Sequence, residues 1–177
     1  MTDYCVVVAE RARARLFTLE TSDAPEMTAS PYLFERKAFT NPTRKAADED
    51  IWTDTRRGAH REHQAAQIAG QTTGVPHHNY DEHREDNERQ VNREFARDLV
   101  AELKKMLSKH GIRNVVLCAE KQMLGMLRPE LDRAVTPNVR LEVVAKDLTN
   151  LSSHELHKKL AHDGLIPEQK RARSPGQ

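Results

Sequence analysis

Long apolar runs are missing from this sequence. Hydrophobic residues make up 37% of its 177 residues, which is below the ~45–50% of an average domain, although that base rate also counts glycine. No run approaches the ~20 apolar residues that a transmembrane helix needs. The first four residues lack the basic start of a signal peptide, and residues 5–9 are too short for its apolar core. We therefore expect a cytoplasmic protein without a membrane span.

Cysteine, aromatic residues and net charge are also low. The two cysteines, Cys5 and Cys118, lie inside short apolar runs, so we expect packed thiols rather than a disulfide or a metal pair. The formal net charge of +1 argues against capture of nucleic acid or anionic membrane by bulk electrostatics. Aromatic residues form 5% of the chain, so few side chains are available to stack on bases.

Motifs of catalysis are absent as well. The sequence contains no GxGxxG, GxxxxGK[ST], HExxH or GxSxG pattern. Five of the nine histidines gather in one polar stretch, but none of them form the i, i+4 pair of a zinc protease and no cysteine accompanies them. A solvated polar segment explains them better than a metal does, and a pH-responsive contact is a third interpretation. We predict no metal, no cofactor and no enzymatic activity.

Two short continuous apolar runs, residues 5–9 and 115–119, predict strands that are buried on both faces. Before the second run, apolar residues recur at spacings of three and four, which predicts an amphipathic helix over residues 91–111 that ends at Gly111. A helix over residues 120–127 is expected next, with a restart at Pro129. Helix, buried strand and helix are the core of an α/β layer fold.

The remaining elements complete a mixed sheet. Residues 15–19 follow the first run too closely for a helical crossover, so they are expected to pair with it as an antiparallel hairpin. Further strands are expected within residues 27–35 and at 139–144. Ser152 and Glu155 form a capping box before a helix over residues 153–160. We predict one α/β domain over residues 1–163, a mixed β-sheet flanked by helices, and a mobile basic tail over residues 164–177.

A long polar insertion interrupts this domain at about residues 40–90, where no leucine occurs. A stretch of this length without structure is normally functional or disordered. We expect residues 81–90 to extend the long helix toward its N-terminus. Arg56 and Arg57 lie in the insertion and are candidate phosphate contacts, and the Ala69-Gly70-Gln71 triplet in the same stretch is typical of a turn made by Gly70 and Gly74.

Three arginines at alternate positions, Arg11, Arg13 and Arg15, would share one face of an extended backbone. One interpretation is a solvated turn and edge face. The other is a surface that contacts an anion or phosphate. The sequence leaves both open.

Three segments, which follow one another along the chain in the same order as in a known family, carry a resemblance to it: residues 6–17, residues 95–99 with 115–119, and residues 146–152 with Glu155-Leu156. Together with residues 124–128, they resemble the bacterial host attachment proteins, which are also described as proteins required for attachment to host cells. The resemblance covers nearly all of residues 4–160 and weakens across the insertion.

At a greater distance, this family resembles the middle domain of archaeal and eukaryotic release factors and of Pelota. That resemblance implies a mixed sheet flanked by helices, similar to the ribonuclease H arrangement. In release factors a Gly-Gly-Gln loop precedes the long helix, and its glutamine assists hydrolysis of peptidyl-tRNA. Gly70 and Gln71 match the end of that motif, while Ala69 stands where the first glycine would be and resists the positive φ that glycine allows.

The resemblance implies a non-enzymatic interaction protein with an unknown protein partner. The alternative is a ribosome- or tRNA-associated factor, whose candidate contacts are Arg11, Arg13, Arg15, Arg56, Arg57, Gly70 and Gln71. A ribonuclease is suggested by fold analogy alone, and the two apolar runs carry no carboxylate for its metal ions. Whether the chain forms a homo-oligomer stays open.

Overall fold

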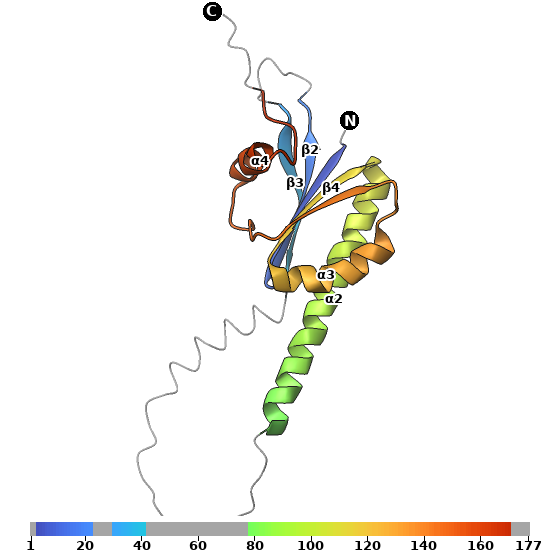
Figure 1. Cartoon of the computed structure of the whole chain (residues 1–177), viewed down its shortest axis with the longest axis vertical. Helices are drawn as coiled ribbons and strands as arrows, with labels where there is room; N and C mark the ends of the chain where they lie inside the picture. The colour runs from blue at the N-terminus through green and yellow to red at the C-terminus, as the bar shows by residue number, and fades with distance from the viewer. Residues whose placement is uncertain (1–2, 23–29, 42–77, 171–177) are drawn as a thin grey trace, which may run out of the picture.

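The structure, a computed structural model, describes residues 3–22, 30–41 and 78–170, with side chains of the long helix from residue 86 onward. Five strands form one sheet in the order β3-β2-β1-β4-β5 (Figure 1). Their bounds are Tyr4–Ala9 (β1), Arg13–Glu20 (β2), Tyr32–Thr40 (β3), Asn114–Ala119 (β4) and Arg140–Val144 (β5). β2 is antiparallel to both of its neighbours, whereas β1, β4 and β5 are parallel to one another. The predicted mixed sheet is confirmed.

The two central strands, β1 and β4, are apolar on both faces because helices cover both faces of the sheet. Alternate residues of a strand point to opposite sides. Cys5, Val7 and Ala9 belong to the core beneath helices α2 (His78–His110) and α3 (Lys121–Ala134). Val6 and Val8 belong to the core beneath α4 (Ser153–His162). The continuous apolar runs therefore predicted the centre of the sheet correctly.

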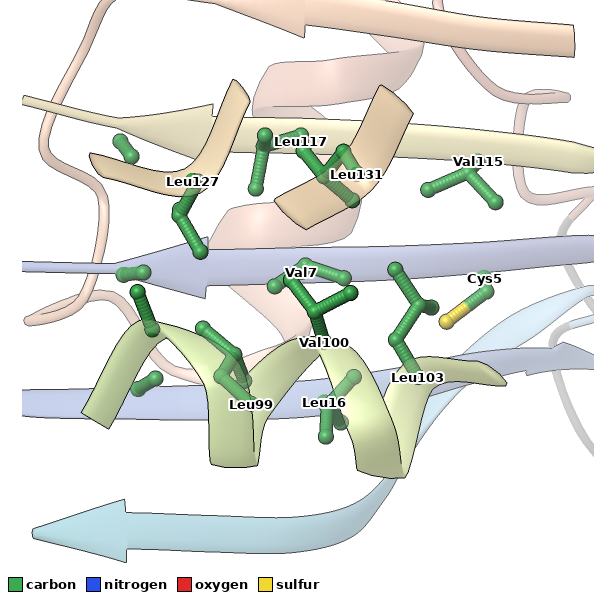
Figure 2. Packing of buried hydrophobic residues seen from close by; sticks show 14 of the residues in the cluster. Cys5, Val7, Leu16, Leu99, Val100, Leu103, Val115, Leu117, Leu127 and Leu131 are labelled. Carbon is green, nitrogen blue, oxygen red and sulfur yellow. The ribbon is translucent and has the colours of Figure 1, made fainter. Parts of the chain in front are cut away.

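The larger core lies between the sheet and the pair α2 and α3. Figure 2 shows Leu99 and Leu103 of α2 and Leu127 of α3 directed at Val7 and Leu16 of the sheet. All five side chains are almost completely buried. Burial of one such side chain contributes roughly 1.5–3 kcal/mol, so this interface fixes the position of the long helix on the sheet.

The smaller core lies under α4, which begins with the predicted capping box between Ser152 and Glu155. Leu156 and Leu160 of α4 pack against the sheet together with Ile166, which is 5% exposed. Residues 164–170 were predicted to belong to the mobile tail. Instead, they return along the sheet, where the backbone of Lys170 pairs with that of Ser30. The apolar Leu165 and Ile166 give this segment a reason to pack; residues 171–177 lie outside the described part of the chain.

Two strands extend at least two residues beyond their predicted bounds. β3 covers Tyr32–Thr40 rather than ending at residue 35, and it pairs with β2 along its whole length, with a bulge between Leu16 and Phe17. β2 begins at Arg13, two residues earlier than expected. β3 is an edge strand and mostly exposed, so its second half needs no apolar pattern and gave no sequence signal.

The predicted helix restart at Pro129 is wrong, because α3 continues through it. Met123, Leu124, Leu127 and Leu131 form one buried stripe that holds the helix on both sides of the proline. Proline has no backbone N–H, so the carbonyl of Gly125, four residues before Pro129, lacks its usual helical donor. Gly125 is exposed, and its carbonyl can bind water instead. Tertiary packing thus outweighs the local signal of proline.

Helix α2 has 33 residues and confirms the predicted N-terminal extension, which begins even earlier, at His78. Asn92 is buried at the margin of the body, where its Oδ1 accepts a hydrogen bond of 2.9 Å from Nδ2 of Asn41. Asn41 also donates to the carbonyl of Arg11 and, through its backbone, to that of Ala12. Beyond this clamp the helix projects from the sheet (Figure 1). We call residues 78–91 the α2 arm; at 1.5 Å per residue it is about 20 Å long.

Candidate functional site

The carboxyl ends of the parallel strands β1, β4 and β5 meet at one end of the sheet, which we call the carboxyl edge. α/β folds most often bind ligands at this end of the strands. Glu10 follows β1, Glu120 follows β4, and residues 145–151 form the connector between β5 and α4. The hairpin between β1 and β2 brings Arg11, Arg13 and Arg15 to the same edge. The structure therefore gathers the three predicted arginines near the ends of these strands.

Arg15 is the most deeply placed of the three, with 19% of its side chain exposed. Its Nη1 donates to the carbonyls of Thr149 at 3.1 Å and Leu151 at 2.7 Å. Its Nε and Nη2 donate to Oε2 of Glu35 on β3. The guanidinium also lies over the ring of Phe17, 4.8 Å from its centre. Arg15 thus joins two strands to the connector before α4.

Arg11 and Arg13 are also paired with carboxylates. Nε of Arg13 lies 2.7 Å from Oε1 of Glu10, and its Nη2 donates to Oδ1 of Asn150. Nε of Arg11 lies 3.1 Å from Oε1 of Glu120, a buried oxygen for which the described residues supply no well-directed hydrogen bond. Since each arginine faces one carboxylate, the positive charge at this edge is compensated. An anion would have to compete with these carboxylates.

Asp147 orders the connector so that it fits Arg15. Its Oδ1 accepts hydrogen bonds from the backbone N–H of Thr149 at 2.9 Å and from the Thr149 hydroxyl at 2.7 Å. This side-chain turn is typical of aspartate before a threonine. It leaves the carbonyls of Thr149 and Leu151 available to Arg15. The first and third segments of the family resemblance are therefore joined in space.

The remaining predicted site residues cannot be placed. Arg56, Arg57, Gly70 and Gln71 lie outside the described residues. Within the part of the chain that the structure describes, no three histidine, cysteine, aspartate or glutamate side chains gather as a metal-ligand set. In the same part, no helix is both long and apolar enough to cross a membrane.

A second charged region lies between β3 and the C-terminal half of α2, and the sequence analysis missed it. A hollow of about 210 Å³ is lined by Arg36, Lys37, Glu102, Lys105, Met106, Lys109 and His110. We call it the basic hollow. Glu102 lies 3.0 Å from Nζ of Lys37 and 3.4 Å from Nζ of Lys105. Its hydrogen bond with Lys37 is the main reason that the pKa of Glu102 lies below its usual value.

A partial sequence signal for the basic hollow exists. Lys105 and Lys109 are separated by four residues and therefore share a face of α2. The cations of the neighbouring strand, Arg36 and Lys37, lie in the half of β3 that was not predicted. Without that half of the strand, nothing in the sequence brings the two pairs together.

Among curated proteins, no relative matches this chain. Among solved structures, the chain is similar to the Ppx/GppA phosphatase of Aquifex aeolicus, type II variant, with 9% identity and a TM-score of 0.41. The similarity covers 81% of this chain and 36% of that one, so the chain spans about a third of the phosphatase. A likeness at this TM-score supports no statement on activity.

One family model matches most of the sequence. It is described as "Protein required for attachment to host cells" and matches residues 5–160. This range includes all five strands except the first residue of β1, and it extends almost to the end of α4. The chain therefore belongs to the host attachment family.

Proposed function

We propose that this member of the host attachment family is a non-enzymatic interaction protein that works in the cytoplasm and binds a protein partner through the α2 arm. The observation that carries the proposal is the projection of α2 beyond the sheet (Figure 1). In globular proteins, a helix is usually stabilised by packing its apolar face against a core. In the part of the chain that the structure describes, the arm extends past the core that holds Leu99 and Leu103, so a partner would supply contacts that this core does not.

The exposed side chains at the base of the arm and on the adjoining turns of α2 suit a polar partner surface. Arg89, Arg93 and Arg97 are four residues apart and therefore lie in a row with about 6 Å between neighbours. Asp86 and Glu94 lie beside them in an open hollow. Charges of both signs on one face give register and partner choice more than raw affinity.

Site-specific photo-crosslinking in cells tests this proposal. A photoreactive residue at Gln90, which is exposed on the arm, is compared with one at Lys158, which is exposed on α4. We expect a discrete crosslinked protein from position 90 that is absent from position 158 and is lost when Arg89→Glu and Arg93→Glu are combined. Equal products from both positions, or none from position 90, would refute the arm as the binding element.

The second candidate is a ribosome- or tRNA-associated factor, in line with the distant resemblance to release factors. The specific observation in its favour is the basic hollow, where cations of β3 and α2 outnumber carboxylates. Co-sedimentation with ribosomes from lysate across a salt series tests it. Association that falls steeply as salt rises supports this candidate, because counterion release makes phosphate contacts sensitive to salt. Protein that stays entirely in the supernatant at low salt refutes it.

A further inference from the structure

We propose that the basic hollow, together with Phe34, is a binding site for single-stranded RNA. This inference rests on the second candidate function and names its site and ligand chemistry. It does not involve the arginines at the carboxyl edge, whose carboxylate partners already occupy them.

The charge of the basic hollow is not compensated. Lys37 and Lys105 share one carboxylate, Glu102, which can neutralise only one of them. Lys109 lines the same hollow and has no carboxylate partner among the described residues. Arg36 is paired, with Glu20. Two positive charges therefore remain on a concave surface, where they can contact consecutive phosphates.

An exposed aromatic ring adjoins these cations. Phe34 is 45% exposed, which is more than any other aromatic residue of the described strands. The guanidinium of Arg36 lies over its ring, 4.6 Å from the centre, and Arg36 also lines the hollow. A flat ring with a guanidinium beside a cationic groove is the combination on which unpaired bases stack.

The helix dipole and an anionic membrane would also favour cations at this surface, but each predicts a different behaviour. Lys109 and His110 stand in the last turn of α2, where cations stabilise the helix dipole. That role alone would give no RNA affinity. For a membrane, Phe34 is the one large aromatic side chain exposed there among the described residues, and Arg36 covers one face of its ring. A base fits this arrangement better than a lipid tail does.

The test uses the purified full chain and a fluorescent single-stranded oligouridylate, with binding followed by anisotropy over a salt series. The combined variant Lys105→Gln and Lys109→Gln is compared with Lys104→Gln, an exposed neighbour on α2 that does not line the hollow. Each lost phosphate contact should reduce the slope of log K against log salt by about 0.7, so the double variant loses about 1.4. The ratio of the RNA affinity of the native chain to that of the double variant should therefore fall about 7-fold between roughly 50 and 200 mM salt.

Phe34 gives an independent readout. Phe34→Leu should weaken binding by at least about 5-fold without changing the salt slope, because stacking is not electrostatic. Val143→Ala, at the other large apolar side chain that is exposed among the described residues, should leave binding unchanged.

The inference is overturned if the oligouridylate does not bind at low salt, if Lys104→Gln weakens binding as much as the double variant, or if the chain binds vesicles of anionic phospholipid instead. Ribosome co-sedimentation separates failure of the site from failure of the function. If the double variant still sediments with ribosomes and no variant affects oligouridylate binding, the site is wrong and the second candidate function stands. If the native chain neither binds RNA nor sediments, both fail.

Discussion

The substitution Arg15→Ala tests whether the main role of Arg15 at the carboxyl edge is to hold the connector before α4 against the sheet. It removes four hydrogen bonds: one each to the carbonyls of Thr149 and Leu151 and two to Glu35. It also removes the contact of the guanidinium with the ring of Phe17. The exposed pair Arg13–Asn150 then remains to tie the connector before α4 to β2.

The magnitude follows from burial. A hydrogen bond to a charged group contributes about 1.5–3 kcal/mol. The two carbonyl bonds count most, because the Glu35 carboxylate is one-third exposed and can be rehydrated. Water can also reach part of the connector, so the loss should stay below the sum of the bonds, at about 2–4 kcal/mol. Arg13→Ala, at a side chain that is 42% exposed, should cost no more than about 1 kcal/mol.

Urea unfolding followed by circular dichroism measures this difference, with Arg15→Lys as the variant that keeps the charge and loses the forked geometry. We expect Arg15→Lys to fall between the native chain and Arg15→Ala. Equal losses in the free energy of unfolding from Arg13→Ala and Arg15→Ala, or a loss below about 1 kcal/mol from Arg15→Ala, would refute this structural role. In that case the edge would be available to an anion after all.

Three further predictions concern the stability of the fold. Leu103→Ala, in the core between α2 and the sheet, should lower the free energy of unfolding by about 2–5 kcal/mol in urea, whereas Ala101→Gly on the exposed side should cost about 1 kcal/mol. Ser152→Ala removes the capping box of α4 and should cost about 1 kcal/mol, measured as a lower thermal midpoint. Burial lowers the pKa of His157 from 6.5, so the folded chain binds fewer protons than the unfolded one as the pH falls through 6.5. Stability should therefore decline below about pH 6.5, and His157→Gln should remove that decline; a native chain equally stable at pH 5 and 7.5 would contradict it.

The sequence predicted the centre of this fold better than its margins. Continuous apolar residues identified β1 and β4 because a strand covered on both faces must be apolar throughout. The second half of β3 carries the polar residues Arg36, Lys37 and Thr40, since it lies at an exposed edge. The break expected at Pro129 did not occur because the buried stripe of α3 continues past it. Local signals failed where tertiary contacts decided the outcome.

The candidate site shows the same division. Alternation predicted that Arg13 and Arg15 share a face, and both lie on β2, although the strand was expected to begin only at Arg15. Their partners could not be predicted, because Arg15 contacts Thr149, which is 134 residues away in the sequence. The basic hollow likewise joins β3 to α2 across the polar insertion. Contacts of such sequence separation depend on the register of the whole sheet, which composition and periodicity do not specify.

The buried hydrogen bond between Asn41 and Asn92 bears on how the fold accommodates the long polar insertion. It holds the residue that follows β3 against α2 and so brings together the two ends of the fifty residues that lie between Asn41 and Asn92 in the sequence. For a flexible loop, doubling the length costs only about 0.6 kcal/mol in closure entropy once its ends are held. Since Asn41 and Asn92 already hold these ends together, we expect variants of this chain with a shorter or longer segment between them to keep the same sheet.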